Sequence, residues 1–316
     1  MNERILKEIT VEVTQQCPNK CIFCSSESSI KCSTFIPYEK LKEISLFAKS
    51  KGATEINISG GEPRYHDHIE MYLDYNNMLG LKSNFYTSGN CNIESLLNAL
   101  RFYNITNVKF IFDYPSYRTD EYFALTGRDS LSTVNENIKK CIDRKFDVEV
   151  HFVPTEINMR SVYNTCLWLK RMGVKQVNLL KLVIQGRAKE FKEVLEVKNY
   201  RILKEEVEDI KKNLCDDTFK LRCGIPFNDI AKQHLKCTAI TNKLVIKYDG
   251  NILPCEAFKE DKDLFVLGNI YKDSLEDVWE NTNSYSNNGE CLCNSKSRRY
   301  LDRLTELSQE NGLYDA

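Results

Sequence analysis

The sequence lacks a long apolar run. Its best stretch, Val177–Ile184, is interrupted by Lys181, whereas a membrane-spanning helix needs about 20 apolar residues. Residues 1–10 lack the apolar core of a secretion signal. Internal repeats and low-complexity tracts are also missing. Neither sign of charge is in excess, because the formal net charge is only -1. These absences argue against a membrane protein, do not favour nucleic acid as the main partner, and lead us to expect a cytoplasmic protein.

Cysteine, in contrast, is abundant. The chain has 13 cysteines in 316 residues, and without a secretion signal we do not read them as a disulfide framework. In a reducing compartment, clustered cysteines more often ligate metal, and isolated ones pack as small hydrophobic residues. The closely spaced cysteines are Cys17, Cys21, Cys24, Cys291 and Cys293.

Short apolar runs alternate with amphipathic ones up to about residue 190. The predicted strands are Glu8–Thr14, Glu55–Ser59, Lys82–Thr87, Val108–Asp113, Val148–Val153 and Gln176–Val183. The predicted helices are Tyr38–Ser50, Ile69–Leu79, Ile93–Phe102, Leu131–Arg144 and Ser161–Met172. This alternation predicts a parallel sheet with helical crossovers. The units are too few for a closed eight-stranded barrel, but a curved open barrel and a doubly wound sheet both fit.

The pattern changes after residue 190. Lys189–Asn213 reads as one charged helix, and Lys243–Pro254 alternates around Asp249-Gly250, which predicts a β-hairpin with a type I′ turn. Ser274–Glu280 is typical of a short helix. We therefore expect a core over residues 1–190, a connector over 191–235 and a small C-terminal module over 236–316.

The first cysteine group directly follows the first predicted strand. In Cys17-Pro-Asn-Lys-Cys21-Ile-Phe-Cys24, three thiolates lie on one loop and can converge on one metal centre. A zinc site with Cys32 as the fourth ligand is one alternative, and chance is another. Three thiolates would leave one iron of a four-iron cluster open, as a catalytic metal site requires.

Two motifs together carry a family resemblance. The spacing Cys-x3-Cys-x2-Cys, with Phe23 before the last cysteine, resembles the signature loop of the radical S-adenosylmethionine superfamily. One strand–helix unit later, Gly60-Gly61-Glu62-Pro63 resembles the second motif of that superfamily. The resemblance implies an α/β fold, a partial (β/α)6 TIM-like barrel.

The resemblance also implies cofactors and a reaction. Cys17, Cys21 and Cys24 would hold a [4Fe–4S] cluster whose fourth iron binds S-adenosylmethionine. An electron from a donor of flavodoxin or ferredoxin type would then lead to a 5′-deoxyadenosyl radical that abstracts a substrate hydrogen atom. The protein itself would position the reactants and exclude water.

Further cofactor contacts are expected from their positions after the strands. The expected cofactor-binding residues are Phe23, Gly60, Gly61, Glu62, Pro63, Ser88, Asn90, Asn158 and Arg187. Glycines let backbone approach a ligand closely, a carboxylate accepts a charge-assisted hydrogen bond from an amino group, and a guanidinium suits a carboxylate. The alternatives are a core aromatic for Phe23, a plain turn at Thr87–Asn90 and an exposed surface arginine for Arg187.

The second cysteine group resembles an auxiliary-cluster module. Cys237 and Cys255 bracket the predicted hairpin, and Cys291 with Cys293 closes the set. This arrangement resembles the SPASM module or its shortened form, twitch, and implies one auxiliary [4Fe–4S] cluster held by these cysteines. A structural zinc held by the same four thiolates is the alternative.

Cys223 lies between the core and this module. It is a candidate cluster ligand, a candidate packed thiol, or a hydrogen-atom donor that quenches a substrate radical, as in radical peptide epimerases.

Three classes of function remain open. The first is an enzyme that modifies an unactivated carbon of a peptide or protein by crosslinking, epimerisation or oxidation. The second is a dehydrogenase that oxidises a small molecule such as an alcohol or a sugar. The third is a non-catalytic metal-binding or electron-transfer protein.

A Cys21→Ala variant tests the first cysteine group. We expect this variant to lose all S-adenosylmethionine cleavage, because the two remaining thiolates would not hold the cluster properly. Anaerobic reconstitution with iron and sulfide, addition of dithionite and S-adenosylmethionine, and chromatography of 5′-deoxyadenosine measure this. Surviving turnover would contradict the ligand set, and no product from the wild-type protein would support the non-catalytic class.

Overall fold

The computed structural model describes residues 4–224, 227–232, 236–239, 241–259 and 266–282. In this part of the chain, one sheet of ten strands has the order β10-β9-β8-β1-β2-β3-β4-β5-β6-β7. The strands are β1 (Glu8–Thr14), β2 (Glu55–Gly60), β3 (Lys82–Thr87), β4 (Val108–Asp113), β5 (Asp147–Phe152), β6 (Gln176–Leu179), β7 (Lys220–Cys223), β8 (Lys243–Ile246), β9 (Asn251–Leu253) and β10 (Gly268–Asn269).

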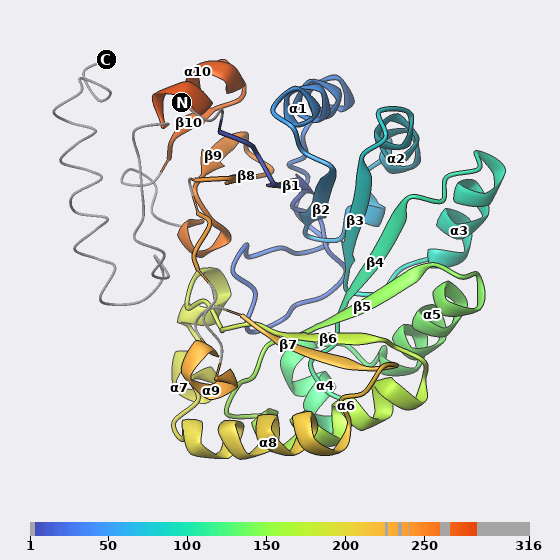
Figure 1. The fold of residues 1–316 in the computed structure, drawn as a ribbon, viewed down its shortest axis with the longest axis vertical. Helices are drawn as coiled ribbons and strands as arrows, with labels where there is room; N and C mark the ends of the chain where they lie inside the picture. Colours follow the sequence, from blue (N-terminus) through green and yellow to red (C-terminus); the bar gives the residue numbers. More distant parts are fainter. Residues whose placement is uncertain (1–3, 225–226, 233–235, 240, 260–265, 283–316) are drawn as a thin grey trace, which may run out of the picture.

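Helices line the outer side of this sheet, which curves into an open arc (Figure 1). The α-helices are α1 (Tyr38–Ser50), α2 (Ile69–Met78), α3 (Ile93–Phe102), α4 (Thr119–Thr126), α5 (Leu131–Asp143), α6 (Val162–Arg171), α7 (Lys192–Leu195), α8 (Tyr200–Asn213), α9 (Asn228–Ala231) and α10 (Leu275–Asn281). Short 3₁₀ turns are η1 (Pro63–Tyr65), η2 (Met159–Ser161), η3 (Gly186–Lys189) and η5 (Glu256–Phe258).

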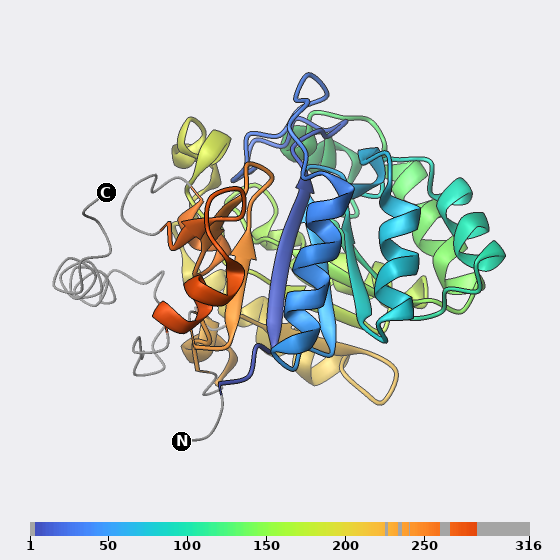
Figure 2. The ribbon, with the colours of Figure 1, turned by 90° about the horizontal axis from the view of Figure 1, so that it is seen from above.

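The strand order decides between the two architectures that the sequence left open. Strands β1 to β7 follow one another without a reversal and pair in parallel, whereas a doubly wound sheet reverses its order at a switch point. The fold is therefore a partial barrel. Strand β8 adds in parallel to the free side of β1, and β9 and β10 continue antiparallel. In Figure 2 this C-terminal segment lies beside β1 and α1.

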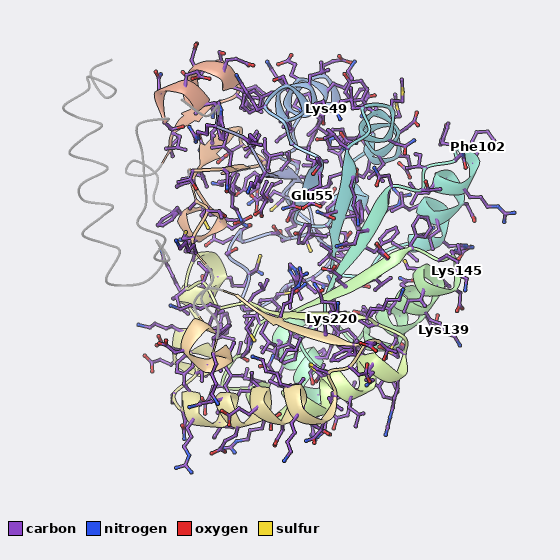
Figure 3. All side chains as sticks on the ribbon, viewed as in Figure 1. Lys49, Glu55, Phe102, Lys139, Lys145 and Lys220 are labelled. Atoms are coloured by element: carbon purple, nitrogen blue, oxygen red, sulfur yellow. The ribbon has the colours of Figure 1, made fainter. Side chains whose placement is uncertain are left out.

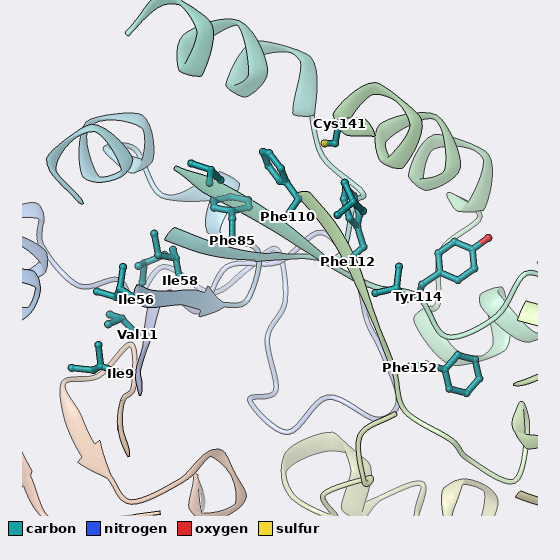
Figure 4. Packing of buried hydrophobic residues seen from close by; sticks show 14 of the residues in the cluster. Ile9, Val11, Ile56, Ile58, Phe85, Phe110, Phe112, Tyr114, Cys141 and Phe152 are labelled. Carbon is teal, nitrogen blue, oxygen red and sulfur yellow. The ribbon is translucent and has the colours of Figure 1, made fainter. Parts of the chain in front are cut away.

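The two faces of the sheet differ in character. Apolar side chains such as Val11, Ile58 and Phe110 are fully buried against the helices (Figure 4). The alternating residues Thr10 and Glu12 of β1 lie on the opposite face, because successive side chains of a strand point to opposite sides. This inner face surrounds the lumen of the barrel and is largely polar.

Most elements of the barrel agree with the sequence. Strands β1, β3 and β4 and helices α1 and α3 have the predicted bounds. The predicted helix Lys189–Asn213 is wrong as a single element, because the chain forms η3, α7 and α8 over this range. Helix α4 and strand β7 were not predicted. The short strand Lys220–Cys223 has two charged residues in four, so it offers little apolar alternation.

The C-terminal hairpin is confirmed, but its turn is not type I′. Strands β8 and β9 pair antiparallel, with Ile246 opposite Ile252. Gly250 has a φ of +87°, whereas Asp249 is not among the residues with positive φ, and a type I′ turn needs positive φ at both positions. Instead the Gly250 N–H donates to the Lys247 carbonyl at 2.9 Å. Within this turn over residues 247–250, only Gly250 has a positive φ.

The periphery is polar with scattered apolar side chains. Side chains extend from the helical layer around the barrel, and Phe102 and Lys145 point away from the molecule (Figure 3). Phe102 is 81% exposed. None of the helices in the described ranges has the length and apolar character that crossing a bilayer requires.

Packing against α3 provides a stability test. Leu97 of α3 has no exposed surface, whereas Met71 of α2 is 51% exposed. We expect Leu97→Ala to lower the free energy of unfolding by about 2–5 kcal/mol, because a buried leucine leaves a cavity. Met71→Ala, the matched control, should change it by no more than about 0.5 kcal/mol. Urea denaturation followed by circular dichroism measures both, and equal losses would contradict the packing described.

Candidate active site at the carboxyl ends of the strands

A cavity of about 250 Å³ lies where the strands β1 to β6 end. Because these strands are parallel, the loops that follow them meet at one end of the barrel, where active sites of such folds lie. The residues lining it are Cys17, Asn19, Cys21, Phe23, Cys24, Ser25, Ser26, Ser28, Ser59, Gly60, Gly61, Ser88, Asp113, Pro115, Thr126, Val153, Leu180, Lys181, Leu182, Val183 and Lys259.

The first cysteine group converges on this cavity. Cys17, Cys21 and Cys24 all line it, whereas Cys32 does not and instead lies 3.4 Å from the Ser29 hydroxyl. Burial, with a smaller effect from Glu62, raises the pKa of Cys17 to about 12. Burial likewise raises the pKa of Cys21 well above its ordinary value, and Cys24 adds to this. Without metal these groups are therefore thiols, and metal binding must release their protons.

The cysteine loop is held by groups far away in the sequence. The Arg187 guanidinium donates to the Cys21 carbonyl at 2.8 Å and to the Ser28 carbonyl at 2.9 Å, and the Arg187 N–H donates to the Cys24 carbonyl at 3.0 Å. Arg187 was expected to reach a cofactor carboxylate. In the structure two of its five guanidinium N–H donors bind carbonyls of the loop, and the contact with a cofactor carboxylate stays a prediction.

Helix α4 provides a second support for the loop. The Lys20 N–H donates to the Thr126 carbonyl at 3.0 Å, and the Ile22 N–H donates to the Leu125 carbonyl at 2.9 Å. The Arg128 guanidinium follows directly after the helix and donates to the Pro18 carbonyl at 2.7 Å. This role could not be predicted from the sequence, because contacts made to backbone carbonyls leave no residue-type signature.

The two glycines after β2 pack against the start of the cysteine loop. The Gly61 N–H donates to the Thr14 carbonyl at 2.7 Å. A Cβ at Gly61 would lie 2.3 Å from the Gln16 carbonyl oxygen, and one at Gly60 would lie 2.3 Å from the Thr14 carbonyl oxygen. Both glycines line the cavity, but the close approach that requires glycine is made to this chain's own backbone.

Glu62 is fully buried beside Ser88, one of the residues that line the cavity. Its buried carboxylate accepts hydrogen bonds from the Thr87 hydroxyl at 2.9 Å and from the Ser88 N–H and hydroxyl at 2.8 and 2.7 Å. Burial raises the pKa of Glu62, although these hydrogen bonds oppose the change. The side chain thus joins the ends of β2 and β3, and the expected contact with a cofactor amino group stays a prediction.

The remaining expected contacts divide into two groups. Phe23 and Ser88 line the cavity. Pro63, Asn90 and Asn158 are not among its lining residues.

Pro63, Asn90 and Asn158 instead have positions within the protein structure. Pro63 is buried at the first position of η1. The Asn90 amide donates to the Asn19 side chain at 2.8 Å. The fully buried Asn158 donates to the Pro115 carbonyl at 2.8 Å and accepts from the Thr155 N–H at 2.7 Å.

Cys223 lies on the opposite side of the sheet from the lumen. It is 4% exposed within the main apolar cluster, where burial raises its pKa to about 11 while Lys211 of α8 lowers it. A thiol in the helix-facing layer cannot face a substrate in the lumen. The expected role as hydrogen-atom donor is therefore not supported, and the packed-thiol alternative fits.

The second cysteine group is partly within the described residues. Cys255 follows β9, and burial raises its pKa to about 12, with contributions from Glu256 and from Cys237. The two thiols that bracket the hairpin are thus close enough to influence each other. Cys291 and Cys293 lie outside the described residues.

Asp113 and Lys259 are two of the cavity residues that were not predicted as site residues. Asp113 is the last residue of β4, and its side chain is accessible from the cavity. The protein around the cavity still desolvates the carboxyl group, and this burial, together with Glu62, raises its pKa to about 7. Lys259 follows η5 and lines the cavity from the C-terminal segment. The position of Asp113 at a strand end was a usable signal, but nothing local in the sequence marks Lys259.

Comparison with protein families agrees with this geometry. Residues 11–169 match the model of the Radical SAM superfamily, and residues 237–302 match SPASM, an iron-sulfur cluster-binding domain. The chain belongs to the radical SAM superfamily. It is therefore an enzyme whose cofactors are S-adenosylmethionine and iron–sulfur clusters.

Its similarity to individual proteins is distant. It is 25% identical over 272 residues to the antilisterial bacteriocin subtilosin biosynthesis protein AlbA of Bacillus subtilis (strain 168), covering 85% of this chain and 58% of AlbA. It thus spans well under two thirds of that relative's length. It is 22% identical over 275 residues to GTP 3′,8-cyclase of Sulfurimonas denitrificans, covering 82% of this chain and 83% of the cyclase.

Solved structures share the fold. Streptococcus suis SuiB bound to S-adenosylmethionine matches with a TM-score of 0.72 at 19% identity, covering 93% of this chain and 70% of SuiB. Native anSMEcpe with bound AdoMet matches with a TM-score of 0.68 at 16% identity, covering 87% and 82% of the two chains.

The residues present fit the implied cofactors. Among the described residues, no group of three His, Cys, Asp or Glu side chains is arranged to hold a single metal ion. Three thiols that share one cavity match instead the thiolate donors that iron–sulfur clusters take. The same cavity has an aromatic side chain, hydroxyls and glycine backbone for an organic cofactor.

Gly61 provides a test of the loop packing. We expect Gly61→Ala to reduce the iron content of the reconstituted protein several-fold, because the added methyl group overlaps the Gln16 carbonyl. Gly80→Ala is the matched control: at φ +69° it costs about 1–2 kcal/mol of stability but lies away from the cavity. Iron and sulfide assays measure the effect, and an unchanged iron content in Gly61→Ala would contradict this packing.

Proposed function

We propose that this enzyme modifies a peptide or protein substrate by hydrogen-atom abstraction, with crosslinking, epimerisation or oxidation as the outcome. AlbA is named for the biosynthesis of a bacteriocin, and a SuiB structure with a TM-score of 0.71 contains its precursor peptide SuiA. GTP 3′,8-cyclases are also among the relatives, so similarity alone does not select the substrate.

The charge of the lumen is the observation that favours a peptide. Lys109 pairs with Glu149 at 2.6 Å, and Lys243 pairs with Glu8 at 2.9 Å.

The same matching occurs at Lys259, which lines the cavity. Lys259 pairs with Glu12 at 2.5 Å, and Lys243 makes a second pair, with Glu256 at 2.8 Å. A nucleoside triphosphate needs several cations that are not already neutralised, whereas these buried lysines are matched by carboxylates. A peptide chain, which is largely neutral and rich in hydrogen-bonding groups, is compatible with such a lumen.

The cavity residues take separate roles in this proposal. Cys17, Cys21 and Cys24 hold the catalytic cluster, and Cys237 and Cys255, with Cys291 and Cys293, hold the auxiliary one. The reduced catalytic cluster and S-adenosylmethionine would together supply the radical chemistry. Gly60, Gly61 and Arg187 fix the cysteine loop, and Phe23, Ser88 and Asp113 orient the organic cofactor and the substrate while excluding water.

Deuterium transfer tests the substrate class. Cells of the source organism are grown in deuterated medium, and their extract is separated into fractions above and below 1 kDa, a cut-off of about ten residues. We expect the reduced holoenzyme to incorporate deuterium into 5′-deoxyadenosine from the larger fraction, and protease digestion of that fraction to abolish the transfer. Mass spectrometry measures the deuterium content.

Two controls make the result decisive. Cys21→Ala must give no transfer from either fraction. Deuterium from the smaller fraction, or from deuterated GTP, would overturn the peptide proposal and favour a small-molecule or nucleotide substrate.

A further inference from the structure

Lys259 lies where the two cysteine-bearing segments of the chain meet. It follows η5, which begins directly after Cys255. Its ammonium group is 2.5 Å from a Glu12 carboxylate oxygen and donates to the Ser26 hydroxyl at 3.0 Å and the Ser25 hydroxyl at 3.4 Å. Ser25 and Ser26 directly follow Cys24, so one side chain joins the auxiliary segment to the first cysteine loop.

The neighbouring backbone strengthens this junction. The Lys259 N–H donates to the Gln185 side chain at 3.1 Å, and the Gln185 amide donates to the Ala257 carbonyl. Gln185 lies two residues before Arg187, whose guanidinium holds the cysteine loop. Lys259 therefore belongs to a continuous set of contacts around the catalytic loop. Its position is fixed by Glu12 of β1, by the serines after Cys24 and by Gln185.

The ion pair is strongly buried. The Lys259 side chain is 10% exposed and that of Glu12 is 1% exposed. One Glu12 oxygen also accepts from Ser26 at 3.0 Å, whereas the other has no hydrogen-bond partner among the described residues. Because water screens charges poorly at such a place, both charges act on their surroundings over a longer range than surface charges do.

The electrostatic relations agree with this geometry. Burial alone would lower the pKa of Lys259, but the neighbouring groups, Glu12 first among them, together outweigh burial and the pKa is raised. Glu256 and Cys24 add to the increase. The ammonium group is thus a fixed positive charge, and the Cys24 sulfur lies within its influence.

We propose that Lys259 is a positioning residue that joins the auxiliary segment to the catalytic cysteine loop, and that the Lys259–Glu12 pair sets the reduction potential of the cluster held there. The inference deepens the proposed function, because it takes Cys17, Cys21 and Cys24 as the ligands. Charge near a cluster is a recognised determinant of its potential. A cation stabilises the reduced form, which carries one more negative charge, and an anion destabilises it.

Opposite shifts from the two partners test the proposal. Lys259→Met removes the cation and should lower the midpoint potential, whereas Glu12→Gln removes the anion and should raise it. We expect a shift of about tenfold in the one-electron reduction equilibrium, which corresponds to about 59 mV. The double variant should return close to the wild-type value, and Lys259→Arg should retain it.

The measurement is a redox titration of the holoenzyme followed by electron paramagnetic resonance, using the signal that changes when S-adenosylmethionine is added. Lys109→Met is the matched control, because it breaks another buried ion pair, 20% and 17% exposed, with Glu149 on β4 and β5. It should leave the potential unchanged.

Each other result overturns a defined part of the idea. Shifts of both single variants in the same direction, or no shift in either, would overturn the electrostatic role. If Lys259→Met fails to bind iron, the double variant decides: a wild-type potential supports the proposal, and a potential that differs from wild type overturns it. A wild-type protein without a signal that responds to S-adenosylmethionine would instead overturn the ligand set of the proposed function.

Discussion

The contact between the end of β2 and the start of the cysteine loop is the constraint on which the site depends. Gly60 and Gly61 lie so close to the Thr14–Gln16 backbone that no side chain fits between them. This contact fixes where the loop leaves β1, and thus where Cys17 lies. Arg187 and the end of α4 then hold the rest of the loop by its carbonyls. Contacts of the backbone therefore hold the site in place, and they determine where the three thiols lie.

Much of the barrel was predictable because its outer face must be apolar to pack on helices. Strands such as β4, with Phe110 and Phe112 buried, follow this pattern with few exceptions. Strand β7 and helix α4 escaped prediction for physical reasons. β7 is four residues long with charges at alternate positions, and α4, with only two of its apolar side chains fully buried, presents a weak stripe. Their positions come from pairing and from long-range contacts, which the local sequence does not contain.

The site shows a similar division. The spacing of Cys17, Cys21 and Cys24 predicted that the three thiols converge, and they line one cavity, since closely spaced residues on one loop cannot lie far apart. The roles of Glu62, Asn158 and Arg187 could not be predicted in this way. A motif places a residue at a strand end, but whether the side chain turns toward the cavity or toward its own backbone depends on neighbours elsewhere in the sequence.

The pairing of β1 with β8 has a consequence for biosynthesis. Glu8 and Lys243 are neighbours across this pair although 235 positions separate them. As the ribosome synthesises the chain, one edge of the first strand therefore stays open until the last quarter of the protein has emerged. Open strand edges are prone to mispairing, and such distant pairing is slow. The emerging chain has to keep this edge from other partners, and the pairing of β8 with β1 also brings the two cysteine-bearing segments together.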